Sequence, residues 1–453
     1  MIREIKNRKE PFVDEWLIEK KDGLSLKLGT PVSLGRALTF DRPWERGSVT
    51  YLSLIQDGNK ALLYYRGNLS REHLSTDFDD SQVTCVAKTD DGNTFERIPA
   101  GIYEPGLENN NIILKGEDSH NFAPFYDDNP ECPFEERYKA VAGEGHDEAT
   151  RGLREYFSKD GIHWNLLSGT PVITKGQFDS HNVAFYDKGA GLYRCYCRYW
   201  IEDERPSDGY HGIRGINSVS SKDFKVWTDP VENRYGFKVT EHFYTNSIVP
   251  YPGAEHILVA LPMRFNPERE KNPGWPAKGV SDSVFMSSRN GEDWSRPCRE
   301  AFIRAGIDRD NWGDRSQIMT RGLYVHEDGS VSMYIDRHYR LDSNFLEHYK
   351  IRPDGFMSLH AGWDDGNMIT YPLTFGKGEL TINASTGAYG YVKITLLDES
   401  GNIMPGYEGP EWYGDSYGEI YGFEKPLSDI AGRPVRLRVE LKDADLYSIQ
   451  VRQ

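Results

Sequence analysis

Short runs of apolar or alternating residues recur along most of the chain, and the same kind of turn follows them. Residues 84–87, 216–219 and 283–286 are typical of strands that are buried on one or both faces. The turn consists of Ser or Thr, any residue, Asp or Asn, Gly, two more residues and an aromatic residue, as in residues 158–164. Because Gly adopts the positive φ that a tight hairpin needs, the pattern predicts β-hairpins.

The spacing of these turns indicates a repeated unit. Their acidic or amide positions are residues 91, 160, 223, 290 and 354, at spacings of 69, 63, 67 and 64 residues, although residue 223 is not followed by Gly. The sequence Asp-Ser-His-Asn also occurs twice, at residues 118–121 and 179–182. Units of about four strands at a fixed period are typical of propeller blades. We therefore predict an all-β, five-bladed β-propeller over residues 35–360, the alternative being a β-sandwich with coincidental turns.

Both ends of the chain depart from this repeat. Residues 379–383, 392–396 and 435–441 alternate cleanly between apolar and polar positions. We predict a small antiparallel β-sandwich over residues 365–453, with an accessory role. Residues 1–34 form a lead-in that contains an alternating segment at 24–28, and this segment is a candidate for closing the propeller ring.

Composition narrows the classes of partner. The 453 residues carry a formal net charge of −16 without a basic cluster, which argues against nucleic acid and anionic membranes. Five cysteines spread over the chain do not form a disulfide framework. The N-terminus has no apolar run, so we expect a cytoplasmic protein, or a periplasmic or secreted one if a signal was removed. The aromatic content of 13% favours a saccharide ligand.

Charged residues recur where the innermost strands of the predicted blades begin. Because these strand starts converge on the propeller axis, their side chains meet although they are distant in sequence. The residues at these positions are Asp41, Glu45, Asp118, His120, Asp179, His181, Glu241, Asp314 and Arg315. Converging carboxylates repel one another and acquire different pKa values, which yields one carboxylic acid and one carboxylate at neutral pH. Glycoside hydrolysis requires such a pair.

These features resemble the five-bladed propeller glycoside hydrolases, namely the arabinanase and β-xylosidase enzymes of family 43 and the invertase-like enzymes of family 32. In the arabinanase group, which inverts configuration, a base Asp, a pKa-modulating Asp and an acid Glu lie on the first, third and fourth blades. The resemblance implies that Asp179 is the modulator and Glu241 the acid. Asp41 and Glu45 both fit the base position, and we favour Glu45 because it lies closer to the strand start. Glu131-Cys132-Pro133 matches the invertase acid motif by chance, since the two partner motifs are absent.

Further residues are candidates for binding substrate. Aromatic side chains could form platforms for sugar faces, and Arg264 could bind a hydroxyl or carboxylate. The substrate-binding candidates are Trp44, Asp118, His120, His181, Tyr244, Asn246, Arg264, Trp312, Asp314 and Arg315. We predict no catalytic metal and no required cofactor, although a structural Ca²⁺ could lie near the axis where His120 and His181 approach it.

The sequence thus predicts a glycoside hydrolase that is exo-acting on a plant- or algal-type oligosaccharide, with a pentose or furanoside favoured. Its partner is the oligosaccharide, without nucleic acid or membrane. One alternative is a non-catalytic propeller that binds carbohydrate. A second is a sialidase-like enzyme, which needs an arginine cluster for the substrate carboxylate and a Tyr nucleophile. Arg264 and Arg315 alone do not form that cluster.

Overall fold

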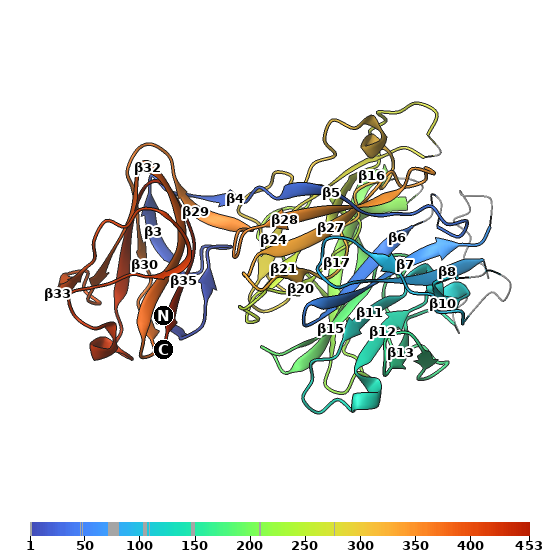
Figure 1. Cartoon of the computed structure of the whole chain (residues 1–453), viewed down its shortest axis with the longest axis horizontal. Coiled ribbons are helices and arrows are strands. Elements are labelled where there is room, and N and C mark those ends of the chain that lie inside the picture. The colour runs from blue at the N-terminus through green and yellow to red at the C-terminus, as the bar shows by residue number, and fades with distance from the viewer. Residues whose placement is uncertain are drawn as a thin grey trace.

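The computed structural model describes residues 2–45, 47, 49–70, 81–102, 107, 109–145, 150–207, 210–275 and 277–453. This part of the chain is built almost entirely of β-strands, which form two regions (Figure 1). One region contains successive antiparallel sheets of the propeller type. The other contains a larger sheet and lies beside both termini (Figure 1).

The first three sheets follow one another along the chain, and within the second and third sheets consecutive strands pair. The first contains β6 (Thr50–Asp57), β7 (Lys60–Asn68), β8 (Gln82–Thr89), β9 (Glu96–Arg97) and β10 (Ile112–Lys115). The second contains β11 (Ala123–Tyr126), β12 (Tyr138–Ala142), β13 (Arg154–Ser158) and β14 (Trp164–Leu166). The third contains β15 (Val183–Asp187), β16 (Leu192–Ser207), β17 (Tyr210–Ser221) and β18 (Val231–Glu232).

The fourth and fifth sheets are less regular. The fourth contains β20 (Val249–Pro250), β21 (Leu258–Ala260), β24 (Met286–Ser288) and β25 (Trp294–Ser295). A side sheet next to it in sequence contains β19 (His242–Phe243), β22 (Met263–Asn266) and β23 (Val280–Ser283). The fifth contains β26 (Tyr324–Val325), β27 (Val331–Arg337), β28 (Phe345–Ile351) and, from the start of the chain, β5 (Val32–Thr39).

The predicted turns at Gly161 and Gly291 join the last two strands of their sheets, and the turn at Gly92 joins β8 to β9. In the second sheet, Ser158 Oγ accepts a hydrogen bond from the amide of Gly161 at 2.9 Å, and Asp160 Oδ1 accepts from the amide of His163 at 2.8 Å. Gly161 has a φ of 74°, as the hairpin requires. The corresponding turns at Gly92 and Gly291 have the same hydrogen bond to their glycine amides.

A buried tyrosine of one sheet binds the turn glycine of the next. Tyr64 on β7 donates its hydroxyl to the carbonyl of Gly161 at 2.9 Å, and Tyr196 on β16 donates to Gly291 at 3.0 Å. Tyr334 on β27, in the fifth sheet, donates to Gly92 in the first sheet at 2.5 Å. The fifth sheet therefore lies against the first, and the repeated turn serves as a contact between neighbouring sheets.

The lead-in is divided between the two regions. The alternating segment at 24–28, considered for closing the ring, instead contains β4 (Ser25–Leu28), which pairs with β29 (Met357–Ala361) of the larger sheet. The strand that completes the fifth sheet is β5, which pairs with β28. At the junction, the amide of Gly29 donates to the carbonyl of Phe356 at 2.9 Å. The chain thus crosses between the two regions at residues 29–31, and the strand after the crossing, rather than segment 24–28, completes the fifth sheet.

The larger sheet contains strands from both ends of the chain. The first of its strands that follow the fifth sheet is β29, which begins at residue 357, inside the range predicted for the propeller. Its remaining strands are β2 (Glu10–Pro11), β3 (Ile18–Asp22), β30 (Gly366–Thr370), β32 (Glu379–Leu397), β33 (Ile403–Glu408), β34 (Asp415–Ile420) and β35 (Arg436–Arg452). β1 (Arg3–Lys6) pairs in parallel with β31 (Leu373–Phe375). The strands β32 and β35 pair along most of their length, and their inward-facing residues form one apolar core.

The five cysteines are free. Within the described residues, no helix combines the length and the apolar character needed to cross a bilayer.

We expect Gly161→Ala to destabilise the protein more than Gly58→Ala. Both glycines have a positive φ, so both variants share the left-handed backbone cost of about 1–2 kcal/mol. A Cβ at Gly161 would lie 2.5 Å from the hydroxyl of Tyr64, whereas a Cβ at Gly58 would meet nothing within 4 Å. The extra cost at Gly161 is about 1–3 kcal/mol, measured by urea unfolding. Equal destabilisation would contradict the role of this turn as a contact between sheets.

Candidate active site

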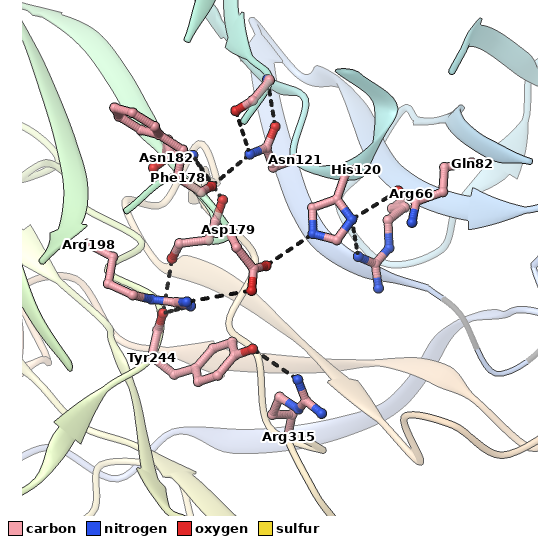
Figure 2. A network of polar contacts seen from close by, with 12 residues as sticks. Arg66, Gln82, His120, Asn121, Phe178, Asp179, Asn182, Arg198, Tyr244 and Arg315 are labelled. Carbon is pink, nitrogen blue, oxygen red and sulfur yellow. Dashed lines mark hydrogen bonds and ion pairs between the residues drawn. The ribbon is translucent and has the colours of Figure 1, made fainter. Parts of the chain in front are cut away.

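The carboxylate of Asp179 lies at the centre of a polar network where the inner strand of the third sheet begins. Its Oδ1 accepts a hydrogen bond from Nε2 of His120 at 3.1 Å, and its Oδ2 lies 3.8 Å from Nη1 of Arg198 (Figure 2). Burial opposes the ionisation of Asp179, but the His120 bond and the charges of Arg198 and Arg315 outweigh it and lower the pKa. The side chain is 41% exposed, so a ligand can reach an anion here.

His120 holds Asp179 without contributing a charge. Burial and the nearby charge of Arg66 lower the pKa of His120 to about 4, so the ring is neutral at neutral pH. If Nε2 carries the proton that is donated to Asp179, then Nδ1 can accept from Nη1 of Arg66, 3.2 Å away. His120 therefore orients the carboxylate in its ionised form.

A second carboxyl group, that of Glu144, is electrostatically coupled to Asp179. Glu144 follows β12 by two residues, and its Oε2 is buried without a hydrogen-bond partner among the residues that the structure describes. Burial and the negative charge of Asp179 raise the pKa of Glu144 to about 7, although Arg198 and Arg151 oppose the shift. Glu144 thus retains its proton in a substantial fraction of molecules at neutral pH.

One amide fixes the backbone next to both carboxyl groups. Nδ2 of Asn121 donates to the carbonyl of Gly143 at 3.0 Å and to that of Phe178 at 2.8 Å, while Oδ1 accepts from the amide of Gly143 at 2.8 Å (Figure 2). Gly143 precedes Glu144, and Phe178 precedes Asp179. Asn121 is fully buried, so it links the second and third sheets at the point where the two carboxyl groups emerge.

Two buried tyrosines form the apolar wall of the network. The ring of Tyr51 stacks on His181 at a centroid distance of 5.7 Å and contacts His120 edge-on at 5.7 Å. Tyr51 has a φ of 51°, a strained conformation for a non-glycine residue. Tyr244 accepts a hydrogen bond from Nη1 of Arg315 at 3.0 Å (Figure 2). Burial raises the pKa of Tyr244, but nearby arginines outweigh this and lower it.

The candidate base Glu45 is part of a structural ion pair. Its side chain is fully buried, and its two oxygens accept from Nε and Nη2 of Arg97 at 2.8 and 2.6 Å and from the hydroxyl of Tyr65 at 2.6 Å. Asp41 binds the same Arg97 at 3.0 Å and is 63% exposed. Trp44 is buried, and its indole nitrogen donates to Asn111 at 2.9 Å. This environment does not suit Glu45 as a base or Trp44 as a sugar platform.

The candidate acid Glu241 is held as a carboxylate by three arginines. Its oxygens lie 2.6 Å from Arg296, 3.2 Å from Arg299 and 3.5 Å from Arg264. Burial raises its pKa, but these contacts outweigh it and the net shift is downward. An acid catalyst needs a proton at neutral pH, so the environment of Glu241 does not suit the role that the sequence predicts for it.

Glu241 and Arg264 line a pocket of about 800 Å³ together with Trp312. The pocket lies over β22 and β23, and it does not include the Asp179 network among its lining residues. Arg264 also binds Asp282 at 2.6 Å, so both charged groups are already paired. The Asp179 network differs from this pocket, because its carboxylate is partly exposed and is electrostatically coupled to Glu144, which keeps its proton in a substantial fraction of molecules.

The remaining candidates are mostly structural. Asp118 binds the guanidinium of Arg154 and the hydroxyl of Tyr156, and Asn246 donates to the carbonyl of His181 at 3.1 Å. Asp314 is buried and binds Arg315 at 2.7 Å.

The surroundings of His181 are unfavourable for the structural Ca²⁺ considered near the axis. His181 is buried and contacts Ser53 at 3.0 Å, and burial together with the charge of Arg321 lowers its pKa to about 3. Ca²⁺ requires oxygen ligands rather than a buried arginine. In the described part of the chain, Asp308, Asp310 and His338 could together hold a metal ion. Asp308 already caps the short helix η3 (Arg309–Trp312) and binds His338 at 2.9 Å.

Sequence reasoning missed several residues in and around the network. These are Tyr51, Arg66, Gln82, Asn121, Glu144, Arg198 and Arg214. A signal existed for Asn121, because it ends the first copy of Asp-Ser-His-Asn, just as Asn182 ends the second. Asn182 also donates to the carbonyl of Phe178, at 2.8 Å. Arg198 and Glu144 belong to no motif and come together only through folding.

Replacing Arg97 tests whether Glu45 is structural. We expect Arg97→Gln to cost about 3–5 kcal/mol of unfolding free energy, because it leaves the buried carboxylate of Glu45 without its cation. Arg234→Gln is the matched control, since Arg234 and Asp293 are each 56% exposed and such pairs contribute about 0–1 kcal/mol. Similar denaturation midpoints for the two variants would show that the Glu45 pair does not hold the first sheet together.

Comparisons with known proteins give similarity of shape alone. No family model and no curated protein matches the chain. Among solved structures, an N-acetylgalactosamine deacetylase from F. plautii in complex with blood group B trisaccharide has a TM-score of 0.47 at 13% identity, covering 73% of this protein and 95% of its own length. A β-1,2-mannobiose phosphorylase from Listeria innocua has a TM-score of 0.46 at 12% identity, covering 70% and 94%. A glycosyl hydrolase from Bacteroides ovatus has a TM-score of 0.42 at 14% identity, covering 77% and 97%. Likeness at this level does not reveal what the present protein binds or cleaves.

Proposed function

We propose that this chain is a glycoside hydrolase whose catalytic region is a five-bladed β-propeller and whose larger sheet is an accessory β-sandwich. The contact between the fifth and first sheets through Tyr334 and Gly92 supports a closed ring. In such a ring the starts of the inner strands face a common axis. His120 and Asp179, which lie at two of these starts, are in direct contact.

The observation that carries this proposal is the pair formed by Glu144 and Asp179. The two groups have pKa values displaced in opposite directions, and Asn121 anchors the backbone next to both. Hydrolysis of a glycosidic bond needs a protonated carboxylic acid and an ionised carboxylate in one site. The opposite displacements of the pKa values of Glu144 and Asp179 support these two roles.

In this mechanism Glu144 donates its proton to the glycosidic oxygen as the bond to the anomeric carbon breaks. Asp179 then acts on the other face of the sugar, either by taking a proton from the attacking water or by attacking the anomeric carbon itself. His120 and Arg198 keep Asp179 ionised during the reaction. The anomer released first distinguishes the two roles of Asp179.

The finer features remain predictions. They are exo-action, a plant- or algal-type oligosaccharide substrate, and a preference for a pentose or furanoside. The alternative of a non-catalytic propeller that binds carbohydrate shares the same site, and it differs in one outcome. The alternative predicts sugar binding without turnover, whether or not Glu144 is intact.

Glu144→Gln tests the acid. We expect kcat/KM of the wild type to fall about tenfold per pH unit above pH 7, because Glu144 loses its proton there. Glu144→Gln should lower kcat by about 10²–10⁴ and remove this dependence, as measured with p-nitrophenyl glycosides and oligosaccharides between pH 4 and 9. Asp179→Asn should abolish turnover at every pH while leaving sugar binding detectable by calorimetry.

Glu241→Gln is the comparison variant, because the sequence-based assignment predicts that it loses activity. Under the present proposal it retains the fall in activity above pH 7, although three arginines lose their shared anion and the thermal midpoint drops. Loss of activity in Glu241→Gln together with a normal pH profile in Glu144→Gln would return the acid role to Glu241.

A further inference from the structure

Arginines gather around the two tyrosines of the site. The guanidinium carbons of Arg198 and Arg315 lie 4.5 and 5.6 Å from the centroid of the Tyr244 ring. A third guanidinium, that of Arg66, lies 5.2 Å from the ring of Tyr51. A chain with a net charge of −16 therefore places these three cations around the Asp179 network, besides Arg214, whose guanidinium carbon lies 5.0 Å from the Tyr244 ring.

Among the described residues, fewer carboxylates than arginines take part in these contacts. Asp314 is shared between Arg315, at 2.7 Å, and Arg340, at 3.1 Å. Asp179 contacts Arg198 at the longer distance of 3.8 Å. Arg340 adds a fourth guanidinium group to the three arginines. Within the residues that the structure describes, this part of the site therefore has an excess of positive charge.

We call Arg66, Arg198, Arg315 and Arg340 the arginine cluster. Other acidic groups near this cluster do not remove the excess of positive charge. Glu144 is half protonated near pH 7. Asp336 is fully buried, and burial raises its pKa to about 8, so it is mostly neutral. His120 and His181 are also neutral, since burial and neighbouring arginines lower their pKa values.

Arg198 has few close partners for its charge and its N–H groups within the described part of the chain. Its side chain is 5% exposed, and its Nε has no hydrogen-bond partner among the described residues. Its Nη2 donates to the carbonyl of Tyr244 at 3.3 Å, which is a long bond. A buried cation without close anionic partners is costly unless a ligand supplies the missing charge.

Two members of the cluster are accessible. The side chain of Arg315 is 22% exposed, and Arg66 is partly exposed. Figure 2 shows Arg66 next to His120 and Arg315 next to the hydroxyl of Tyr244, in two different directions from Asp179. A ligand that reaches Asp179 therefore has two guanidinium groups in its surroundings.

We propose that the Asp179 site takes a sugar that bears an anionic group, either a carboxylate or a sulfate ester, and that Arg66 and Arg315 bind this group. This inference rests on the proposed glycoside hydrolase function and adds the substrate class to it. The planar guanidinium matches both anions through paired hydrogen bonds. A neutral sugar leaves the excess positive charge of the site uncompensated, so the site discriminates against it.

The test uses p-nitrophenyl glycosides that differ at C6 alone. The pairs are β-glucuronide and β-glucoside, α-galacturonide and α-galactoside, and β-galactoside with and without a 6-sulfate. We expect kcat/KM for the carboxylate or the sulfate member of a pair to exceed that of its neutral partner by about tenfold to hundredfold at low salt. The advantage should shrink as the salt concentration rises.

Two variants assign the effect to the arginines. Both arginines also contact the Asp179 network, so Arg315→Gln and Arg66→Gln should slow both members of a pair, but each should lower kcat/KM for the anionic member by about tenfold more than for the neutral member. Arg234→Gln, which removes an exposed arginine that binds Asp293, is the control and should change neither. An equal loss on both members would show that the arginines only shape the site, and would overturn the proposal.

The outcomes separate this inference from the proposed function. Cleavage of neutral glycosides without an anionic preference would leave the hydrolase standing and overturn the anionic substrate. Binding of free glucuronate, galacturonate or galactose 6-sulfate, but not of glucose or galactose, without turnover of any glycoside would overturn the hydrolase and support the anionic ligand. Neither turnover nor binding would overturn both.

Discussion

The hydrogen bonds of Asn121 are the constraint on which the site depends. An amide side chain has both a donor and an acceptor, so one residue can bind backbone groups of two sheets at once. Here it binds Gly143 in the second sheet and Phe178 in the third, and the carboxyl-bearing residues follow directly. These bonds hold the backbone next to both carboxyl groups although Glu144 and Asp179 lie just outside the strands.

Identical chemical groups have different roles here because their surroundings differ. Glu45 and Glu241 are matched by arginines in close contact, which makes them parts of the framework. Asp179 is bound by a neutral His120 and a distant Arg198, so it is ionised but accessible. Glu144 is partly buried and is coupled to an anion, which raises its pKa to about 7. The number and distance of guanidinium groups therefore distinguish the proposed catalytic carboxylates from the structural ones.

The sequence could predict those features that local rules determine. The turn at Gly161 needs positive φ and a serine acceptor, so its spacing along the chain revealed the sheets before any contact was known. The pairing of β5 could not be read in this way, because many alternating strands fit the edge of a sheet equally well. Asp179 was found through the repeated motif, whereas Arg198 and Glu144 approach it only through the packing of separate strands. Ion pairs between residues that are distant in sequence produce no repeated sequence pattern. For this reason the roles of Glu45 and Glu241 could not be predicted from their spacing.

The pairing of β5 with β28 has a consequence for the order in which the protein matures. The ribosome makes β5 long before its partner β28, which emerges only after more than 300 further residues. Until then β5 has an unpaired edge and the fifth sheet is incomplete. β4 likewise has no pairing partner until β29 has been made. Neither region can therefore finish folding on a partly made chain. Contacts of such high sequence separation slow folding, and a chain truncated before residue 345 would leave both regions open to aggregation.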